Sequence, residues 1–132
     1  MGIDHIGLGV PDVEAATAYY DELLALVGFV RQWETGYRDK DWYGAQVFLY
    51  PALEDSDYSR HRVGLQHLSF HVHTRAEVHA VHDWAVARGH EIVHAPKPFP
   101  EYHETFYATF FLDMHGFMIE TVTYESAATD DG

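Results

Sequence analysis

Residues 65–73 read LQHLSFHVH, in which apolar and polar side chains alternate as they do along a half-buried β-strand. The apolar face carries Leu68, Phe70 and Val72, and the polar face carries His67, Ser69, His71 and His73. A buried sheet accepts a row of polar groups only if they find partners or a ligand. The stretch therefore predicts a strand with one face toward a core and the other toward a site.

The same pattern occurs at residues 4–10, DHIGLGV. Aligning His5 with His67 brings the apolar positions of the two stretches into coincidence. Each stretch also leads directly into a helix start, because Asp12 suits an N-cap and Thr74 with Glu77 forms a capping-box pattern. The chain therefore consists of two copies of one unit, each opening with a histidine strand.

Each copy continues as one helix followed by three strands. In the first we expect a helix over 13–27 and strands at 29–33, within 36–44 and at 45–50. In the second we expect a helix over 75–88 and strands at 91–93, 105–112 and 117–123, with a proline-rich loop at 95–100. The prediction is an α+β fold in a single domain, residues 1–125, built from two βαβββ modules. The modules are 1–51 and 65–125, with a linker at 52–64 and a tail at 126–132.

Composition excludes several classes of function. The 132 residues hold 21 acidic and 8 basic side chains, and the formal charge of −13 opposes nucleic acids and anionic membrane surfaces. There are no cysteines, so disulfides, thiolate metal sites and cysteine nucleophiles are ruled out. No apolar run approaches the roughly 20 residues of a membrane span, and no signal segment opens the chain. We expect a cytoplasmic protein that acts on a small molecule.

One carboxylate stands out in the last predicted strand. Glu120 lies between Met118 and Val122 on one face of an apolar segment, where a charge is costly unless it is neutralised. If the two modules pack around a pseudo-two-fold axis, His5 and His67 converge with Glu120 in one cleft. Two imidazoles and a carboxylate form a facial triad suited to Fe²⁺, our first choice, and also to Mn²⁺, Ni²⁺ or Zn²⁺. The sequence thus predicts one divalent metal on these three residues.

The chain resembles the vicinal oxygen chelate superfamily in DHIGLGVPDVEAATAYYDELL, LQHLSFHVHTRAEVHAVHDWA and FYATFFLDMHGFMIETV. That superfamily includes glyoxalase I, extradiol dioxygenases, and the fosfomycin- and bleomycin-resistance proteins. The resemblance implies curved mixed sheets that form a half-open barrel around a central cleft. It also implies that a metal held by residues matching His5, His67 and Glu120 chelates adjacent oxygens of a substrate. It allows pairing of the modules within one chain or across a homodimer.

One departure from the family bears on the reaction. The matching strand of the first module has Phe48 where the second has Glu120. Glyoxalase I has a fourth ligand, a glutamate, at the place of Phe48, and a phenylalanine cannot ligate a metal. The three-ligand pattern favours extradiol-type oxygenation. The alternatives are a glyoxalase-like isomerase, lyase or epimerase, and a metal-free binding protein of the resistance type. Fosfomycin-type chemistry ranks low because no basic residues cluster visibly near the predicted ligands.

Further residues are candidates for supporting roles. His103 and Tyr107, in and after the proline-rich loop, could act as acid, base or oxyanion donor. The expected substrate pocket is lined by Phe48, Tyr50, His71, Phe111 and Met118, which would suit a hydrophobic or aromatic substrate.

Overall fold

The computed structural model describes residues 1–127. The chain divides into two compact units, the first being Met1–Asp57 and the second beginning at Tyr58. The boundary falls inside the predicted linker 52–64, so residues 58–64 belong to the second unit. The predicted tail, 126–132, lies mostly outside the described residues. Each unit is described by itself.

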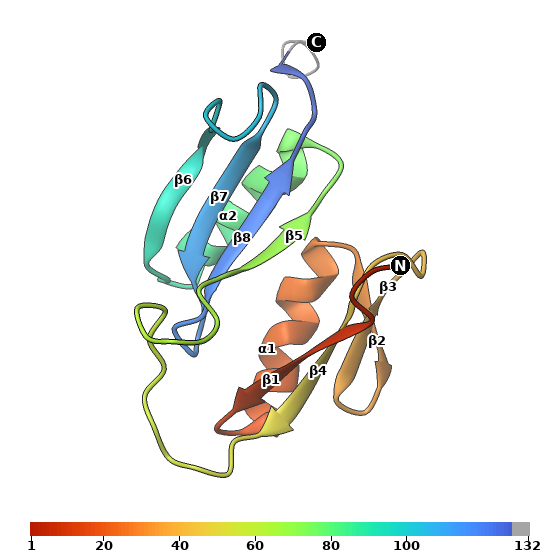
Figure 1. Ribbon diagram of the computed structural model, residues 1–132, viewed down its shortest axis with the longest axis vertical. Coiled ribbons are helices and arrows are strands. Elements are labelled where there is room, and N and C mark those ends of the chain that lie inside the picture. Colours follow the sequence, from red (N-terminus) through yellow and green to blue (C-terminus); the bar gives the residue numbers. More distant parts are fainter. Residues whose placement is uncertain (128–132) are drawn as a thin grey trace. The chain divides into compact units, whose positions relative to one another are not determined.

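Both units have the order strand, helix, and three further strands (Figure 1). The first contains β1 (His5–Val10), α1 (Val13–Leu26), β2 (Phe29–Trp33), β3 (Gly36–Asp39) and β4 (Gln46–Pro51). The second contains β5 (Leu68–His71), α2 (Arg75–Ala87), β6 (Ile92–Pro98), β7 (Tyr107–Leu112) and β8 (Met118–Thr123). The sheet orders, β1-β4-β3-β2 and β5-β8-β7-β6, are equivalent, and each sheet has one parallel pair. The predicted α+β fold of two βαβββ modules is confirmed.

The register of the two parallel pairs confirms the internal repeat at single-residue resolution. Gly7, two residues after His5, is paired with Phe48. Ser69, two residues after His67, is paired with Glu120. Phe48 and Glu120 therefore occupy equivalent places in the two sheets, as the sequence alignment predicted.

The two helices begin and end where their sequences indicate. The Asp12 side chain accepts a hydrogen bond from the amide of Ala15, which makes Asp12 the N-cap of α1. Thr74 and Glu77 form the predicted capping box at the start of α2. Gly28 and Gly89 follow the helices with φ angles of 88° and 77°, a backbone region that favours glycine.

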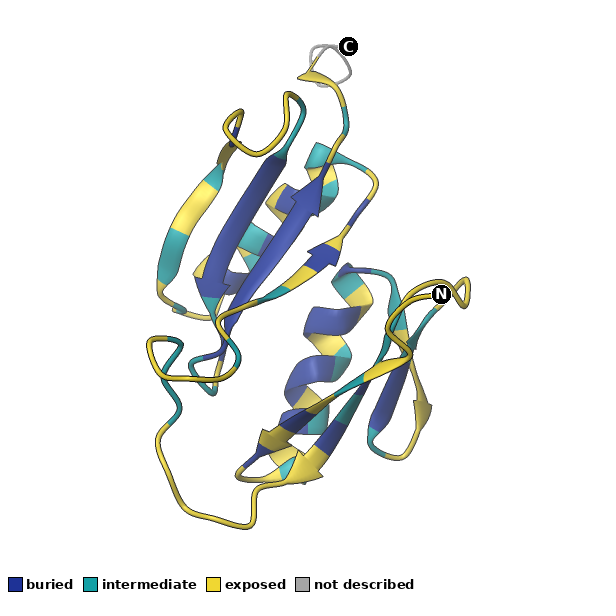
Figure 2. Cartoon of the chain, in the orientation of Figure 1, coloured by how far each residue is buried: buried dark blue, intermediate teal, exposed yellow. Residues whose placement is uncertain are grey.

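Each helix packs on one face of its own sheet and forms a core there. In the first unit, Leu23 and Leu24 of α1 are buried, and so are Val10, Val47 and Leu49 of the sheet. In the second, Val78, Val81 and Ala85 of α2 are buried, and β7 and β8 are buried along almost their whole length (Figure 2). Neither α1, with 14 residues, nor α2, with 13, has the length and apolar character to cross a bilayer, and these are the helices of the described part.

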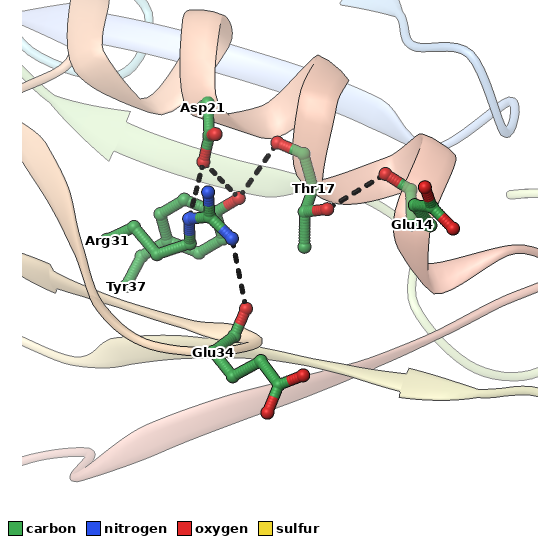
Figure 3. Close-up of polar contacts among 6 residues, drawn as sticks. All are labelled: Glu14, Thr17, Asp21, Arg31, Glu34 and Tyr37. Carbon is green, nitrogen blue, oxygen red and sulfur yellow. Dashed lines mark hydrogen bonds and ion pairs between the residues drawn. The ribbon is translucent and has the colours of Figure 1, made fainter.

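Polar contacts join α1 to its sheet in the first unit (Figure 3). Tyr37 of β3 donates its hydroxyl hydrogen toward Asp21 Oδ1, 2.8 Å away, and lies 3.2 Å from the Thr17 carbonyl oxygen. The Arg31 guanidinium lies 3.2 Å from the same Asp21 oxygen. Burial raises the pKa of the Tyr37 hydroxyl, and the hydrogen bond to Asp21 adds to that effect. The contact orients the helix on the sheet through one phenol.

Two predicted elements differ from the observed ones. The strand expected over 65–73 extends only over Leu68–His71. His67 therefore lies just before the strand and not within it. The proline-rich loop expected at 95–100 is in fact largely strand, because β6 runs to Pro98. Proline is accepted there because β6 is the edge strand of its sheet and its pairing with β7 is interrupted on both sides of His94.

Candidate metal and substrate site

The second unit brings two predicted metal ligands together. Glu120 lies in the middle of β8 and is 4% exposed, and its Oε1 atom is 3.1 Å from Nε2 of His67. Its other carboxylate oxygen, Oε2, is buried without a hydrogen-bond partner among the described residues. Burial raises the pKa of Glu120, although Ser69 and His67 oppose that shift. Such a buried, half-satisfied carboxylate is the kind of group that a cation neutralises.

The orientation of the His67 ring is fixed from the opposite side. Its Nδ1 atom lies 2.5 Å from the Gln66 side-chain oxygen. An amide oxygen can only accept, so Nδ1 donates to Gln66, and Nε2 is the ring nitrogen that faces Glu120. Two atoms that ligate one metal at bond lengths near 2.1 Å and a right angle lie about 3 Å apart. The His67–Glu120 pair fits a divalent metal.

His5, the third predicted ligand, belongs to the first unit and repeats this arrangement. Its Nδ1 lies 2.7 Å from Asp4 Oδ2, which again leaves Nε2 as the ligating nitrogen. Its ring contacts Phe48 edge-on, with 5.5 Å between centroids. In the part of the chain that the structure describes, no third histidine, aspartate or glutamate joins a pair to complete a three-residue group.

Sequence reasoning missed Asp4 and Gln66. Each directly precedes a repeat histidine and holds that ring by its Nδ1 atom. The signal was available, because both copies of the repeat carry a side-chain acceptor at the same position before the histidine.

A cavity of about 620 Å³ opens on the His67–Glu120 side of the second sheet. Its polar lining consists of Arg60, His61, Gln66, His67, His94 and Glu120. Its apolar lining consists of Val93, Phe99, Tyr102, Phe106, Phe110 and Met118. Most of the apolar set belongs to one cluster on this face, opposite to the face that α2 covers. The cavity thus combines an aromatic wall with a polar end that contains the candidate ligands.

Of the five predicted pocket residues, only Met118 lines this cavity. Phe111 is 1% exposed and packs on Trp84 of α2, so it faces the helix, and its neighbour Phe110 lines the cavity instead. His71 lies farther along β5, beside Tyr124. Phe48 and Tyr50 belong to the first unit, where Phe48 contacts His5 and Tyr50 lies against Gly7.

The two predicted catalytic residues lie in different surroundings. Tyr107 is buried on the α2 side, where its hydroxyl is 2.7 Å from Nε2 of His79 and Arg75 stacks on its ring. The structure therefore does not bring Tyr107 to the face that carries Glu120. His103 is exposed in the connection between β6 and β7, and its Nδ1 accepts a hydrogen bond from the Thr105 amide.

The sequence shows no cluster of basic residues near the predicted ligands, and the structure places one basic residue in their cavity. Arg60 lines the same cavity as His67 and Glu120. The sequence does not predict this position, because Arg60 is adjacent to no ligand and residues 58–64 lie in the predicted linker 52–64. The loop instead folds against the second sheet, where the Tyr58 ring packs on Phe117 at 4.6 Å between centroids.

Comparison with known proteins identifies the family. The model of the Glyoxalase/Bleomycin resistance protein/Dioxygenase superfamily matches residues 2–121. The chain belongs to this superfamily. Members include lyases and dioxygenases, many use a divalent metal, and others are not enzymes.

Three similar proteins share 17–28% of their residues with this superfamily member. The uncharacterized protein YqjT of Bacillus subtilis (strain 168) is 28% identical over 94 residues, which cover 68% of this chain and 73% of YqjT. The fold is similar to a glyoxylase/bleomycin resistance protein/dioxygenase domain from Frankia sp. EAN1pec, with a TM-score of 0.72, 17% identity, and coverage of 96% and 94%. It is also similar to lactoylglutathione lyase from Agrobacterium tumefaciens, with a TM-score of 0.61, 21% identity, and 92% coverage of both chains.

Proposed function

We propose that the protein is a metal-dependent enzyme that holds one divalent cation on His67 and Glu120, with His5 as the third ligand. The observation that carries the proposal is the 3.1 Å approach of His67 Nε2 to Glu120 Oε1, beside a buried carboxylate oxygen that has no hydrogen-bond partner among residues 1–127. Fe²⁺ is the first choice, with Mn²⁺, Ni²⁺ and Zn²⁺ as alternatives. When bound, such an ion supplies Lewis acidity toward two adjacent oxygens of a substrate.

The protein's own residues have separable tasks in this proposal. Gln66 and Asp4 hold the two histidine rings by their Nδ1 atoms, so that Nε2 of each ring is turned to the metal. Phe99 and Phe110 bind the apolar part of the substrate and exclude water from the cavity. His103 is the candidate acid, because a ring that accepts at Nδ1 carries its hydrogen at Nε2. Tyr107 has no part in the proposal, since its hydroxyl is buried against α2.

We favour extradiol-type oxygenation of an aromatic substrate as the reaction. An aromatic cavity wall suits a planar ring, and Phe48 stands where a fourth ligand would be needed for the glyoxalase I pattern. The similarity of the fold to a lactoylglutathione lyase keeps a glyoxalase-like isomerase, lyase or epimerase as the second candidate. A metal-free binding protein of the resistance type is the third candidate.

Elemental analysis of untagged protein, prepared without oxygen, tests the proposal. We expect about one equivalent of iron in the wild type and in His71→Ala, and almost none in His67→Ala, because His71 lies at the far end of β5, beside His73 and Tyr124. Oxygen uptake with catechols would then test the reaction. Nickel, zinc or manganese at the same ratio would favour the second candidate. Equal metal contents in all three proteins, or none after reconstitution, would exclude the metal site.

Mixing two inactive variants separates a site within one chain from a site shared by a homodimer. His5→Ala and His67→Ala each lose one ligand. If two chains share each site, the mixture contains heterodimers with one complete ligand set, and metal binding partly returns. If one chain supplies all three ligands, mixing restores nothing.

A further inference from the structure

A short loop at the start of the second unit places a positive charge in the cavity of that unit. The loop, residues 58–65, is tied to itself, because the Tyr58 hydroxyl donates to the Leu65 carbonyl and the Arg62 amide donates to the Ser59 carbonyl at 3.2 Å. The Tyr58 ring anchors it on Phe117, directly before β8. Arg60 lies inside this fixed loop and lines the cavity.

Arg60 is unusual among the arginines of this acidic chain. Arg31 is paired with Asp21, and Arg38 and Arg88 stack on tryptophan rings. No carboxylate among residues 1–127 forms an ion pair with Arg60, although the chain carries 21 acidic residues. A guanidinium that lines a cavity without a carboxylate partner is available to an anionic ligand.

The wall beside Arg60 is suited to a planar group. Phe99 lies between Phe110, at 5.7 Å, and Tyr102, at 5.7 Å and nearly parallel. His94 contacts both Phe99 and Phe110 edge-on. Phe99, Phe110 and Met118 belong to one hydrophobic cluster and line the cavity, so an aromatic ligand can pack against them.

We propose that this cavity binds a small planar molecule that carries an anionic group, and that Arg60 is the residue that recognises the anion. The planar part lies against Phe99 and Phe110, and the anion, a carboxylate or a phosphonate, pairs with the guanidinium fork. The inference rests on the proposed function in naming the substrate class for the same site. It assigns to the cavity a specificity determinant that is separate from the metal ligands.

The test uses metal-free protein and the matched probes 2-naphthoate, 2-naphthylphosphonate and the neutral 2-naphthamide, followed by amide NMR titration. We expect at least one anion to bind the wild type and to shift the amide signals of Phe99 and Phe110. Arg60→Gln should lower the affinity for that anion by about tenfold or more, because a charge-assisted hydrogen bond is lost. Naphthamide affinity should stay within about twofold in the same variant. The probe whose affinity falls more in Arg60→Gln shows whether Arg60 prefers a carboxylate or a phosphonate.

Two controls keep the test decisive. Arg62→Gln removes a charge from the same loop without touching the cavity lining and should leave all three affinities unchanged. Arg60→Lys retains the charge but not the fork, and its amide spectrum confirms folding if Arg60→Gln misfolds. Equal anion affinity in wild type and Arg60→Gln, or naphthamide binding as tightly as the anions, overturns the proposal, as does no binding of either anion to the wild type. Because no metal is present, this result is independent of the elemental analysis.

Discussion

The Nε2 atom of His67 lies 3.1 Å from Oε1 of Glu120, although the two residues are 53 positions apart in the chain. The parallel pairing of β5 with β8 produces this approach, because it places Ser69 opposite Glu120 and His67 diagonally beside it. The carboxylate is 5% exposed as a side chain and the imidazole 37%. Glu120 is thus buried in the sheet, whereas the His67 ring can be reached from the cavity.

Replacing Glu120 by glutamine should have opposite effects on the metal-free and metal-loaded protein. Without metal, Glu120→Gln should raise the free energy of unfolding by about 1 kcal/mol, since a buried carboxylate with an unpartnered oxygen is costly. With added metal, the wild type should gain stability and the variant should not. Urea unfolding with and without Zn²⁺ measures both. Equal stabilisation by metal in the two proteins would remove Glu120 from the ligand set.

Phe110 and Phe111 are adjacent in β7 and face opposite sides of the sheet, so they form a matched pair. Phe111→Ala should lower the free energy of unfolding by about 3–5 kcal/mol, because it empties the core beneath α2. Phe110→Leu should cost less stability and weaken binding of naphthalene probes, because Phe110 lines the cavity. Chemical denaturation and probe titration together check the pair. Weaker probe binding in a folded Phe111 variant such as Phe111→Leu would contradict this assignment of faces.

Tyr37→Phe should lower the free energy of unfolding by about 1 kcal/mol at neutral pH, through loss of the hydrogen bond to Asp21. Tyr43→Phe is the control, since Tyr43 is 78% exposed. The folded-state pKa of Tyr37 is raised above the ordinary value of 10.0, so its stabilising contribution is present below pH 10 and is lost as the pH rises further. The difference between wild type and variant should therefore shrink above pH 10. A pH-independent difference would refute this linkage.

His90 should make the protein less stable in mild acid. Its ring packs against Phe111 at 5.6 Å, and burial lowers its pKa below the ordinary 6.5. The unfolded chain then takes up the proton first, so stability is full above about pH 6.5 and falls as the pH drops toward the folded-state pKa. We expect His90→Gln to reduce the acid-induced loss, and His61→Gln, at an exposed position, to leave it unchanged. Parallel unfolding curves between pH 5 and pH 8 for wild type and His90→Gln would count against the prediction.

Periodicity and repetition were sufficient to predict the two modules and the equivalence of Phe48 with Glu120. Both rest on local signals, namely alternation in two histidine strands and helix caps at Asp12 and Thr74. The same signals could not predict which side chains of β7 face the cavity and which face α2. Its sequence, YATFFL, is apolar on both sides, because α2 covers one face and the aromatic cluster the other. Only the hairpin register, with Phe110 opposite Glu120, decides between Phe110 and Phe111.

Arg60 was inaccessible to sequence reasoning for a different reason. Its place in the cavity depends on the packing of Tyr58 on Phe117, a contact between residues 59 positions apart in a segment without periodicity. The end of β6 was predicted wrongly because proline usually marks a loop, and only knowledge that the strand lies at the edge of the sheet reverses that inference.

The prolines of β6 also limit how the protein can assemble. A strand from another molecule would need amide hydrogens along this edge, and Pro96 and Pro98 supply none. Lys97 between them adds a charge that would have to be desolvated in a continuous intermolecular ladder. With its most apolar strands, β7 and β8, shielded behind such an edge, the second sheet is a poor template for fibril growth through β6.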